Sequence, residues 1–101
     1  MIDFTPLKPY LDEQGRLKEW PSKRNRSKVQ TLALWYLAEK FTSGVAYTEK
    51  EVNSLLNQHH TFNDPALLRR ELFEKGLIQR KLNGSAYWLP PEEPSQLNSL
   101  V

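Results

Sequence analysis

A capping-box sequence near the middle of the chain is the feature that most constrains its fold. Thr48 is followed three residues later by Glu51, and at this spacing each side chain accepts a hydrogen bond from the other residue's backbone N–H at a helix start. We therefore expect a helix over residues 48–58. The preceding residues 45–47 are expected to form a short extended segment.

Periodicity and end signals predict two further helices. Apolar residues recur with helical spacing over residues 27–41, which is typical of an amphipathic helix. Asp64 is a favoured N-cap, Pro65 is a favoured first helical residue, and Gly76 is a favoured terminator. These three residues predict a helix over residues 65–75.

The dipeptide Asn83-Gly84 between two apolar segments predicts a β-hairpin with a two-residue type I′ turn. If Ile78 and Leu89 face the core, Trp88 lies on the opposite face, either partly exposed or covered by an end of the chain. Counting outward from the turn, the expected cross-strand pairs are Leu82 with Ser85, Arg80 with Tyr87, Gln79 with Trp88 and Ile78 with Leu89.

The ends of the chain lack sustained periodicity. Residues 1–20 are expected to be an N-terminal arm with a turn at residues 12–15, residues 21–89 to be the domain, and residues 90–101 to be a flexible, proline-rich tail. The arm is expected to pack on the domain through its apolar residues Phe4, Leu7, Tyr10, Leu11, Leu17 and Trp20. The core of the domain is expected to contain Leu32, Tyr36, Val52, Leu55, Leu56, Leu68, Leu72 and Ile78.

This order of elements predicts an α+β fold. A helix, a short strand, two helices and a C-terminal two-stranded hairpin together form a winged-helix-like arrangement. The helix over residues 65–75 is then the candidate recognition helix, and the hairpin is the wing. Winged helices also serve as protein-interaction modules, so the fold alone does not specify the function.

Three sequence blocks resemble a known bacterial family. The blocks "GRLKEWPSKRNRS", "YTEKEVN" and "LRRELFEKGLIQR…GSAYW" are similar, in this order, to the hallmark blocks of the domain of unknown function numbered two thousand and eighty-seven. The resemblance extends from about Tyr10 to Trp88. Members of that family occur alone or appended to helix-turn-helix transcription regulators. The resemblance implies a regulatory setting and brings no activity, ligand or catalytic residue with it.

Positive charge is concentrated before the first predicted α-helix. Residues 15–28 contain six basic residues and one acid, a net charge of +5, so the rest of a chain whose total is +2 carries −3. Cations are unfavourable at a helix N-terminus, so this stretch suggests an anionic partner such as nucleic acid. The alternative is a solvated loop that keeps the protein soluble.

Two arginines on the predicted recognition helix have different orientations on the helical wheel. Arg69 lies on the inward side and is expected to pair with an acid. Arg70 points outward, beside Glu71 and Glu74 on a nearly neutral face, whereas helices that read DNA are usually basic. In the hairpin, Arg80 and Lys81 lie near the tip, where they are expected to contact nucleic acid, unless Arg80 stacks on Tyr87.

Composition argues against several functional classes. The chain has no cysteine, and no apolar run approaches the about 20 residues that span a bilayer. Its first ten residues do not resemble a signal peptide, so we expect a cytoplasmic protein that does not contact membranes. His59, His60 and Asp64 are too few donors for a metal site, and no nucleophile lies next to a base. We therefore expect the protein to bind no metal and no cofactor, and not to be an enzyme.

Two hypotheses about function remain. The first is nucleic-acid binding, with duplex DNA as the favoured ligand. The second is a protein-interaction or sensing module, acting as a homodimer or with a regulator partner through Trp35, Trp88 or Leu67, without contact to DNA. The charge polarity favours the first hypothesis, for which the candidate binding residues are Arg16, Lys18, Lys23, Arg24, Arg26, Lys28, Arg70, Arg80 and Lys81.

Overall fold

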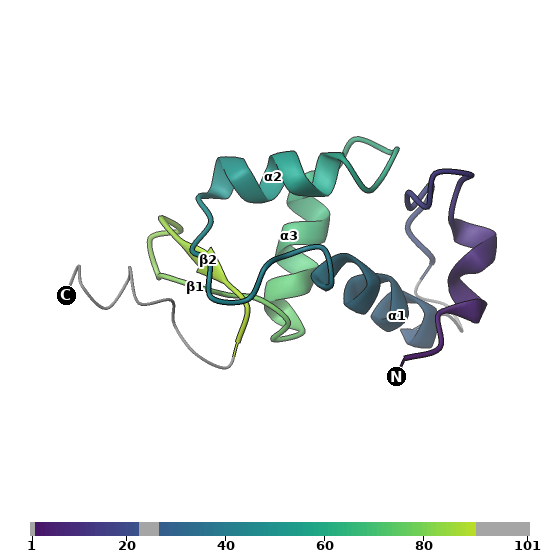
Figure 1. Ribbon diagram of the computed structural model, residues 1–101, viewed down its shortest axis with the longest axis horizontal. Coiled ribbons are helices and arrows are strands. Elements are labelled where there is room, and N and C mark those ends of the chain that lie inside the picture. Colours follow the sequence, from purple (N-terminus) through teal and green to yellow (C-terminus); the bar gives the residue numbers. More distant parts are fainter. Residues whose placement is uncertain (1, 23–26, 91–101) are drawn as a thin grey trace.

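The computed structural model describes residues 2–22 and 27–90, and Figure 1 shows how its elements are arranged. The described residues form an α+β fold, as predicted, with one 3-10 helix, three α-helices and a two-stranded antiparallel hairpin. No helix within these ranges is long and apolar enough to cross a bilayer. The elements are η1 (Thr5–Tyr10), α1 (Ser27–Ala38), α2 (Glu49–Asn57), α3 (Pro65–Glu74), β1 (Gln79–Arg80) and β2 (Tyr87–Trp88).

The predicted caps fix the starts of α2 and α3. The Thr48 hydroxyl accepts the Glu51 N–H at 3.0 Å, and the Glu51 carboxylate accepts the Thr48 N–H at 2.8 Å, which confirms the capping box. The Asp64 carboxylate accepts the Leu67 N–H at 3.1 Å at the start of α3. The two helices pack against each other, and α3 also packs against α1. The buried residues Val52, Leu56, Leu68, Leu72 and Ile78 confirm most of the predicted core.

Helix α1 differs from the prediction in its length and in the side that it buries. It ends at Ala38 rather than at residue 41, because tight i→i+3 bonds, such as the one from the Phe41 N–H to the Ala38 carbonyl, close its last turn. Leu32, predicted in the core, is only partly buried, whereas Leu34 is fully buried. The arm also packs on α1, where the Phe4 ring contacts the Tyr36 ring edge-on at 5.4 Å and the Tyr36 hydroxyl donates to the Gly15 carbonyl at 2.7 Å.

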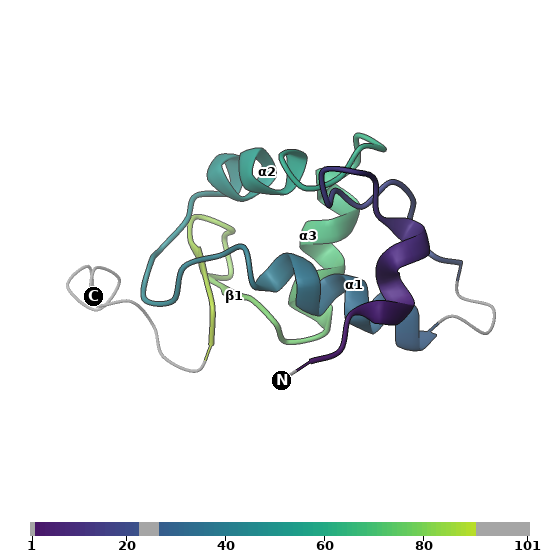
Figure 2. The ribbon, with the colours of Figure 1, turned by 45° about the vertical axis from the view of Figure 1, so that its right-hand side comes forward.

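The N-terminal arm contributes directly to the core. Leu7 and Leu17 are fully buried, and Tyr10 is nearly so. The predicted turn forms, with the Gly15 N–H donating to the Asp12 carbonyl at 3.0 Å and Gly15 in the left-handed region at φ +78°. Figure 2 shows η1 lying against α1.

The arm is also tied to the segment that joins α2 to α3. The Leu17 N–H donates to the His59 carbonyl at 2.8 Å, and the Leu17 carbonyl accepts the Thr61 N–H at 2.9 Å. These bonds form a parallel β-bridge between Leu17 and His60. The arm therefore helps to hold the connection between the two helices.

The predicted register of the hairpin is confirmed, but the predicted turn is wrong. Gln79 pairs with Trp88 and Arg80 with Tyr87. A type I′ turn requires positive φ at both central residues, and only Gly84 (φ +73°) has it. The Asn83 side chain instead accepts the Ser85 N–H at 3.0 Å and stabilises a wider loop in which Leu82 is fully exposed and does not pair with Ser85.

A third extended segment flanks the hairpin. Tyr47 and Tyr87 exchange two backbone hydrogen bonds of 2.7 Å, so the expected extended segment before α2 pairs with β2. This pairing brings Ala46 against Trp88, which is buried rather than exposed. The Trp88 indole N–H donates to the Gln79 side chain at 3.0 Å.

We predict that the arm contributes strongly to stability. Leu17→Ala removes a fully buried side chain and should lower the free energy of unfolding by about 2–5 kcal/mol. Leu82→Ala makes the same chemical change at a fully exposed position, and should change it by less than about 0.5 kcal/mol. Urea denaturation followed by circular dichroism measures both variants. Equal effects would contradict a core role for the arm.

Candidate functional site

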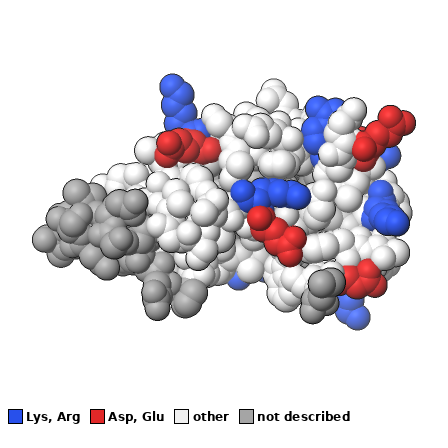
Figure 3. Space-filling view, in the orientation of Figure 1, with Lys and Arg blue, Asp and Glu red and all other residues white. Residues whose placement is uncertain are grey.

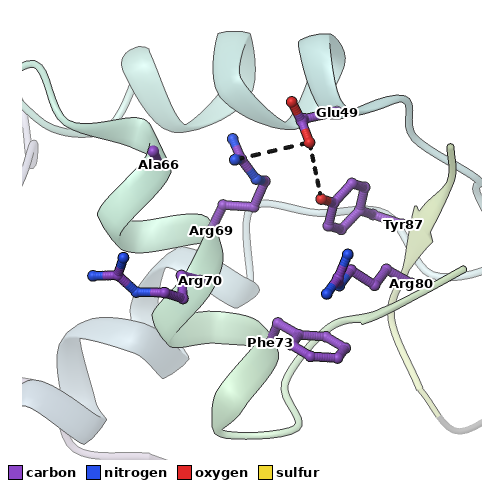
Figure 4. A pocket seen from close by; sticks show the side chains of 7 residues that line it. All are labelled: Glu49, Ala66, Arg69, Arg70, Phe73, Arg80 and Tyr87. Carbon is purple, nitrogen blue, oxygen red and sulfur yellow. Dashed lines mark hydrogen bonds and ion pairs between the residues drawn. The ribbon is translucent and has the colours of Figure 1, made fainter. Parts of the chain in front are cut away.

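A hollow of about 270 Å³ lies between α3 and the hairpin, and Figure 4 shows it from close by. We call it the α3–hairpin hollow. Its charged lining comes from three arginines and one glutamate, and its aromatic lining comes from α3 and β2. The lining residues are Glu49, Ala66, Arg69, Arg70, Phe73, Arg80 and Tyr87.

Arg69 pairs with an acid, as predicted. Its guanidinium lies 3.8 Å from the Glu49 carboxylate, and its side chain is only 19% exposed. The same guanidinium donates to the Asn53 side chain, one turn further along α2. The Tyr87 hydroxyl donates to the same Glu49 oxygen at 3.3 Å (Figure 4). Glu49 therefore connects α2 with both α3 and the hairpin.

Arg80 stacks on a different ring from the one considered in the sequence. Its guanidinium carbon lies 4.6 Å from the centre of the Phe73 ring, whereas the Tyr87 hydroxyl is engaged by Glu49. Arg80 is therefore opposite Tyr87 in the strand register, but its guanidinium stacks on Phe73 of α3. Arg80 forms no ion pair with any acid in residues 2–22 and 27–90. Figure 4 shows its side chain between Tyr87 and Phe73.

Arg70 also lines the hollow, whereas Lys81 does not. Arg70 is exposed and has no acidic ion-pair partner within the described part of the chain. Figure 4 shows its guanidinium directed away from Arg80. Lys81 follows β1 directly and is half-buried. The structure thus brings Arg70 and Arg80 to the lining of one hollow, adds Arg69 to them, and leaves Lys81 outside that lining.

The described part of the basic stretch, residues 15–22 and 27–28, lies at the opposite end of the molecule from the hairpin, as both ribbon views show (Figures 1 and 2). Lys18 and Lys28 are exposed. The Arg16 Nε atom is 2.8 Å from the Asp12 carboxylate, and the Arg16 backbone N–H, which donates to the same carboxylate, lowers the pKa of Asp12. Three other members of the stretch lie outside the described residues, namely Lys23, Arg24 and Arg26.

On the face that Figure 3 shows, the described charged residues do not form one continuous basic patch. In Figure 3, basic and acidic side chains alternate across the face that is shown. The α3–hairpin residues and the described part of the basic stretch are therefore separate groups of cations. Of the predicted binding residues, the structure brings Arg70 and Arg80 together in the α3–hairpin hollow, and the described residues Arg16, Lys18 and Lys28 do not line it.

His60 has a structural role between α2 and α3. It is buried, its Nδ1 lies 2.6 Å from the Leu56 carbonyl, and its Nε2 accepts the Asp64 N–H at 2.9 Å. This arrangement fixes a neutral tautomer, with a proton on Nδ1. Desolvation, followed by the nearby charge of Lys40, lowers the pKa of His59. No group of three or more potential metal ligands occurs among the residues that the structure describes.

Three residues that line the hollow, Glu49, Phe73 and Tyr87, were not predicted as site residues from the sequence. Phe73 was not considered, and Tyr87 was considered only as the cross-strand neighbour and possible stacking partner of Arg80. Glu49 follows the helix N-cap and was not considered. A signal for Phe73 was available, because a large aromatic residue near the end of an amphipathic helix often packs on the next element of the chain.

We predict that the two arginines of α3 differ in their effect on stability. Arg69→Ala removes the partner of the Asn53 side chain and one of the two partners of Glu49, and should lower the free energy of unfolding by about 1–3 kcal/mol. Arg70→Ala should change it by less than about 0.5 kcal/mol. Thermal and urea unfolding of both variants measure the difference. A loss at Arg70 as large as that at Arg69 would contradict the assignment.

Comparison with known proteins identifies the family of the chain. Neither the curated proteins nor the solved structures that were compared gave a match. A family model described as "Uncharacterized protein conserved in bacteria (DUF2087)" matches residues 16–89, well over half of the chain. This range contains α1 to α3 and the hairpin. The chain belongs to this family of uncharacterized bacterial proteins.

Proposed function

We propose that this chain is a winged-helix-like module of the transcription-regulator type that binds nucleic acid. Three features support the fold assignment. The helices occur in the required order, with α2 and α3 packed against each other. The hairpin follows α3, and Tyr47 adds a third extended segment to it, as the short strand of a winged helix would. Helix α3 is then the recognition helix, and the hairpin is the wing.

The contacts of the Arg80 guanidinium are the observation that best supports nucleic-acid binding. Stacking on Phe73 covers a face of the guanidinium and leaves its N–H groups, which lie in the plane, free to donate. A stacked guanidinium also loses less side-chain entropy when it binds, because its position is already restricted. Since no described acid pairs with it, a phosphate oxygen is the ligand that suits it best.

Arg70 and the N-terminal stretch have different roles in this proposal. Arg70 projects from the exposed side of α3 and is the candidate for a base contact. The exposed lysines Lys18 and Lys28 form a second, separate group of cations, and Arg16 is already paired with Asp12. The separation weakens the case for one continuous binding face, so the proposal depends on the α3–hairpin residues.

Titration of duplex DNA at several salt concentrations, followed by fluorescence anisotropy, tests the proposal. Affinity should fall with salt with a log-log slope of about −0.9 per neutralised phosphate. Arg80→Ala should weaken binding to all sequences alike and flatten that slope. Arg70→Ala should relax sequence preference, at a cost of about 1–3 kcal/mol for a bidentate base contact. Lys8→Ala is the control, because Lys8 is an exposed cation on η1, away from the hairpin.

Two results would decide against the proposal. The absence of duplex binding at low salt would remove it altogether. Equal losses for Arg80→Ala and Lys8→Ala would show that only net charge matters. The triple replacement of Lys23, Arg24 and Arg26 by alanine then tests the N-terminal stretch, which should contribute to the salt slope if it contacts phosphates.

Trp35 favours the alternative function, a protein-interaction module. This side chain is 40% exposed and lies between two apolar hollows, of about 310 and 480 Å³. Leu77 and Leu89 line the first hollow, and Leu32 lines the second. Large exposed aromatic residues of this kind are enriched at protein interfaces. Trp88 is buried and does not contribute to this surface.

The alternative predicts that the protein associates through the surface around Trp35. Trp35→Ala should then weaken a dimer detected by sedimentation velocity, while Leu82→Ala, at a fully exposed position in the hairpin loop, should leave it unchanged. A monomer at all concentrations would exclude the homodimer.

A further inference from the structure

Glu49 is the one acid that lines the α3–hairpin hollow, which otherwise carries three arginines. One of its oxygens, Oε1, faces both Arg69 at 3.8 Å and the Tyr87 hydroxyl at 3.3 Å. The same atom lies 3.7 Å from the position that a Cβ on Gly84 would occupy, beside the hairpin loop. The carboxylate oxygen therefore occupies the point where donors from α3 and the hairpin meet (Figure 4).

The contacts that hold the Glu49 carboxylate are weak ones. The distance of 3.8 Å to Arg69 is long for an ion pair, and the distance of 3.3 Å to the Tyr87 hydroxyl is long for a hydrogen bond. The Glu49 side chain is also 52% exposed. Exposed ion pairs typically contribute about 0–1 kcal/mol, because water competes for both partners. Arg69, in contrast, is also held by Asn53. The guanidinium would thus remain at the hollow if the carboxylate moved away.

We infer that the Glu49 carboxylate is an internal counter-anion, and that a phosphate group of the ligand displaces it from the hollow. Arg69 and the Tyr87 hydroxyl then donate to a phosphate oxygen, while Arg80 donates to the same group from its place on Phe73. This inference rests on the proposed function, and it deepens that function by naming the anion and the residue that opposes its binding. The half-exposed carboxylate is free to turn toward solvent.

Because phosphate must displace the Glu49 carboxylate, this residue controls the affinity of the hollow for phosphate. Its negative charge compensates one of the three arginines and lowers the attraction of the hollow for anions. Because the competing charge lies only a few ångströms from the proposed phosphate position, its effect should exceed that of an equally charged residue elsewhere on the surface. Arg69, which stabilises the fold in the free protein, becomes a ligand contact in the complex.

A gain of affinity tests this inference. Glu49→Gln keeps the size of the side chain and a hydrogen-bonding oxygen for Tyr87, and removes the charge. It should tighten binding of inorganic phosphate and of duplex DNA by about three- to tenfold at low salt. Heteronuclear NMR titration with inorganic phosphate, and anisotropy with the duplex, measure the two affinities.

Glu74→Gln is the matched control. It removes the same charge from an exposed position at the end of α3, and Glu74 does not line the hollow. It should change either affinity by less than about twofold. Because a loss of folding lowers affinity, a gain in the Glu49 variant cannot be produced by unfolding. Arg69→Lys in the Glu49→Gln background should abolish most of the gain, since lysine lacks the planar guanidinium fork.

The outcomes separate this inference from the proposed function. Equal effects of Glu49→Gln and Glu74→Gln on both ligands would overturn the inference, while duplex binding that depends on Arg80 would leave the proposed function standing. Tighter phosphate binding by Glu49→Gln, without duplex binding by any variant, would support the anion site and overturn the nucleic-acid function. Tighter binding of both ligands only in the Glu49 variant supports both.

Discussion

The hydrogen bonds of His60 hold α2 and α3 in their relative positions. Its ring bonds the carbonyl of Leu56 in the last turn of α2 and accepts the N–H of Asp64, which caps α3. A buried imidazole that is bonded at both nitrogens cannot rotate without leaving a polar atom unsatisfied. Leu17 of the arm pairs with the backbone on either side of this histidine. The junction between the helices is therefore fixed from both sides.

The geometry of the α3–hairpin hollow follows from this junction. With α2 and α3 fixed, Arg69 reaches both Glu49 and Asn53, which lie one turn apart on α2. The hairpin is placed independently, by the backbone pairing of Tyr47 with Tyr87. The hollow thus lies between the α2–α3 pair and the hairpin, and the guanidinium of Arg80 in the hairpin stacks on Phe73 of α3. Such preorganisation favours binding, because little side-chain freedom remains to be lost.

Local signals predicted most of the elements, because the interactions that define them lie within a few residues. The capping box joins residues three apart, and the cross-strand register follows from the position of the loop. The phase of α3 also predicted that Arg69 faces inward and pairs with an acid. The turn predicted at Asn83-Gly84 was wrong because this dipeptide is compatible with more than one loop geometry. The asparagine side chain accepts the Ser85 N–H, and the type I′ turn does not form.

The remaining features depend on contacts between segments that are distant in the sequence, and such contacts cannot be predicted from the spacing of residues in a single sequence. In α1, Leu34 is fully buried whereas Leu32 is only partly buried, although the periodicity of the helix predicted Leu32 in the core. The segment before α2 covers Trp88. Glu49 meets Tyr87 only in the folded chain, across 38 positions of sequence, so its place in the hollow could not be predicted from spacing.

The most direct measurement is a heteronuclear NMR titration of the protein with duplex DNA that observes the arginine Nε–H and tryptophan indole N–H signals together. If α3 and the hairpin bind nucleic acid, the Arg80 and Arg70 side-chain signals should shift in proportion to complex formation, and the Trp35 indole signal should stay in place. Shifts confined to Trp35, or arginine signals that do not respond at low salt, would contradict the account.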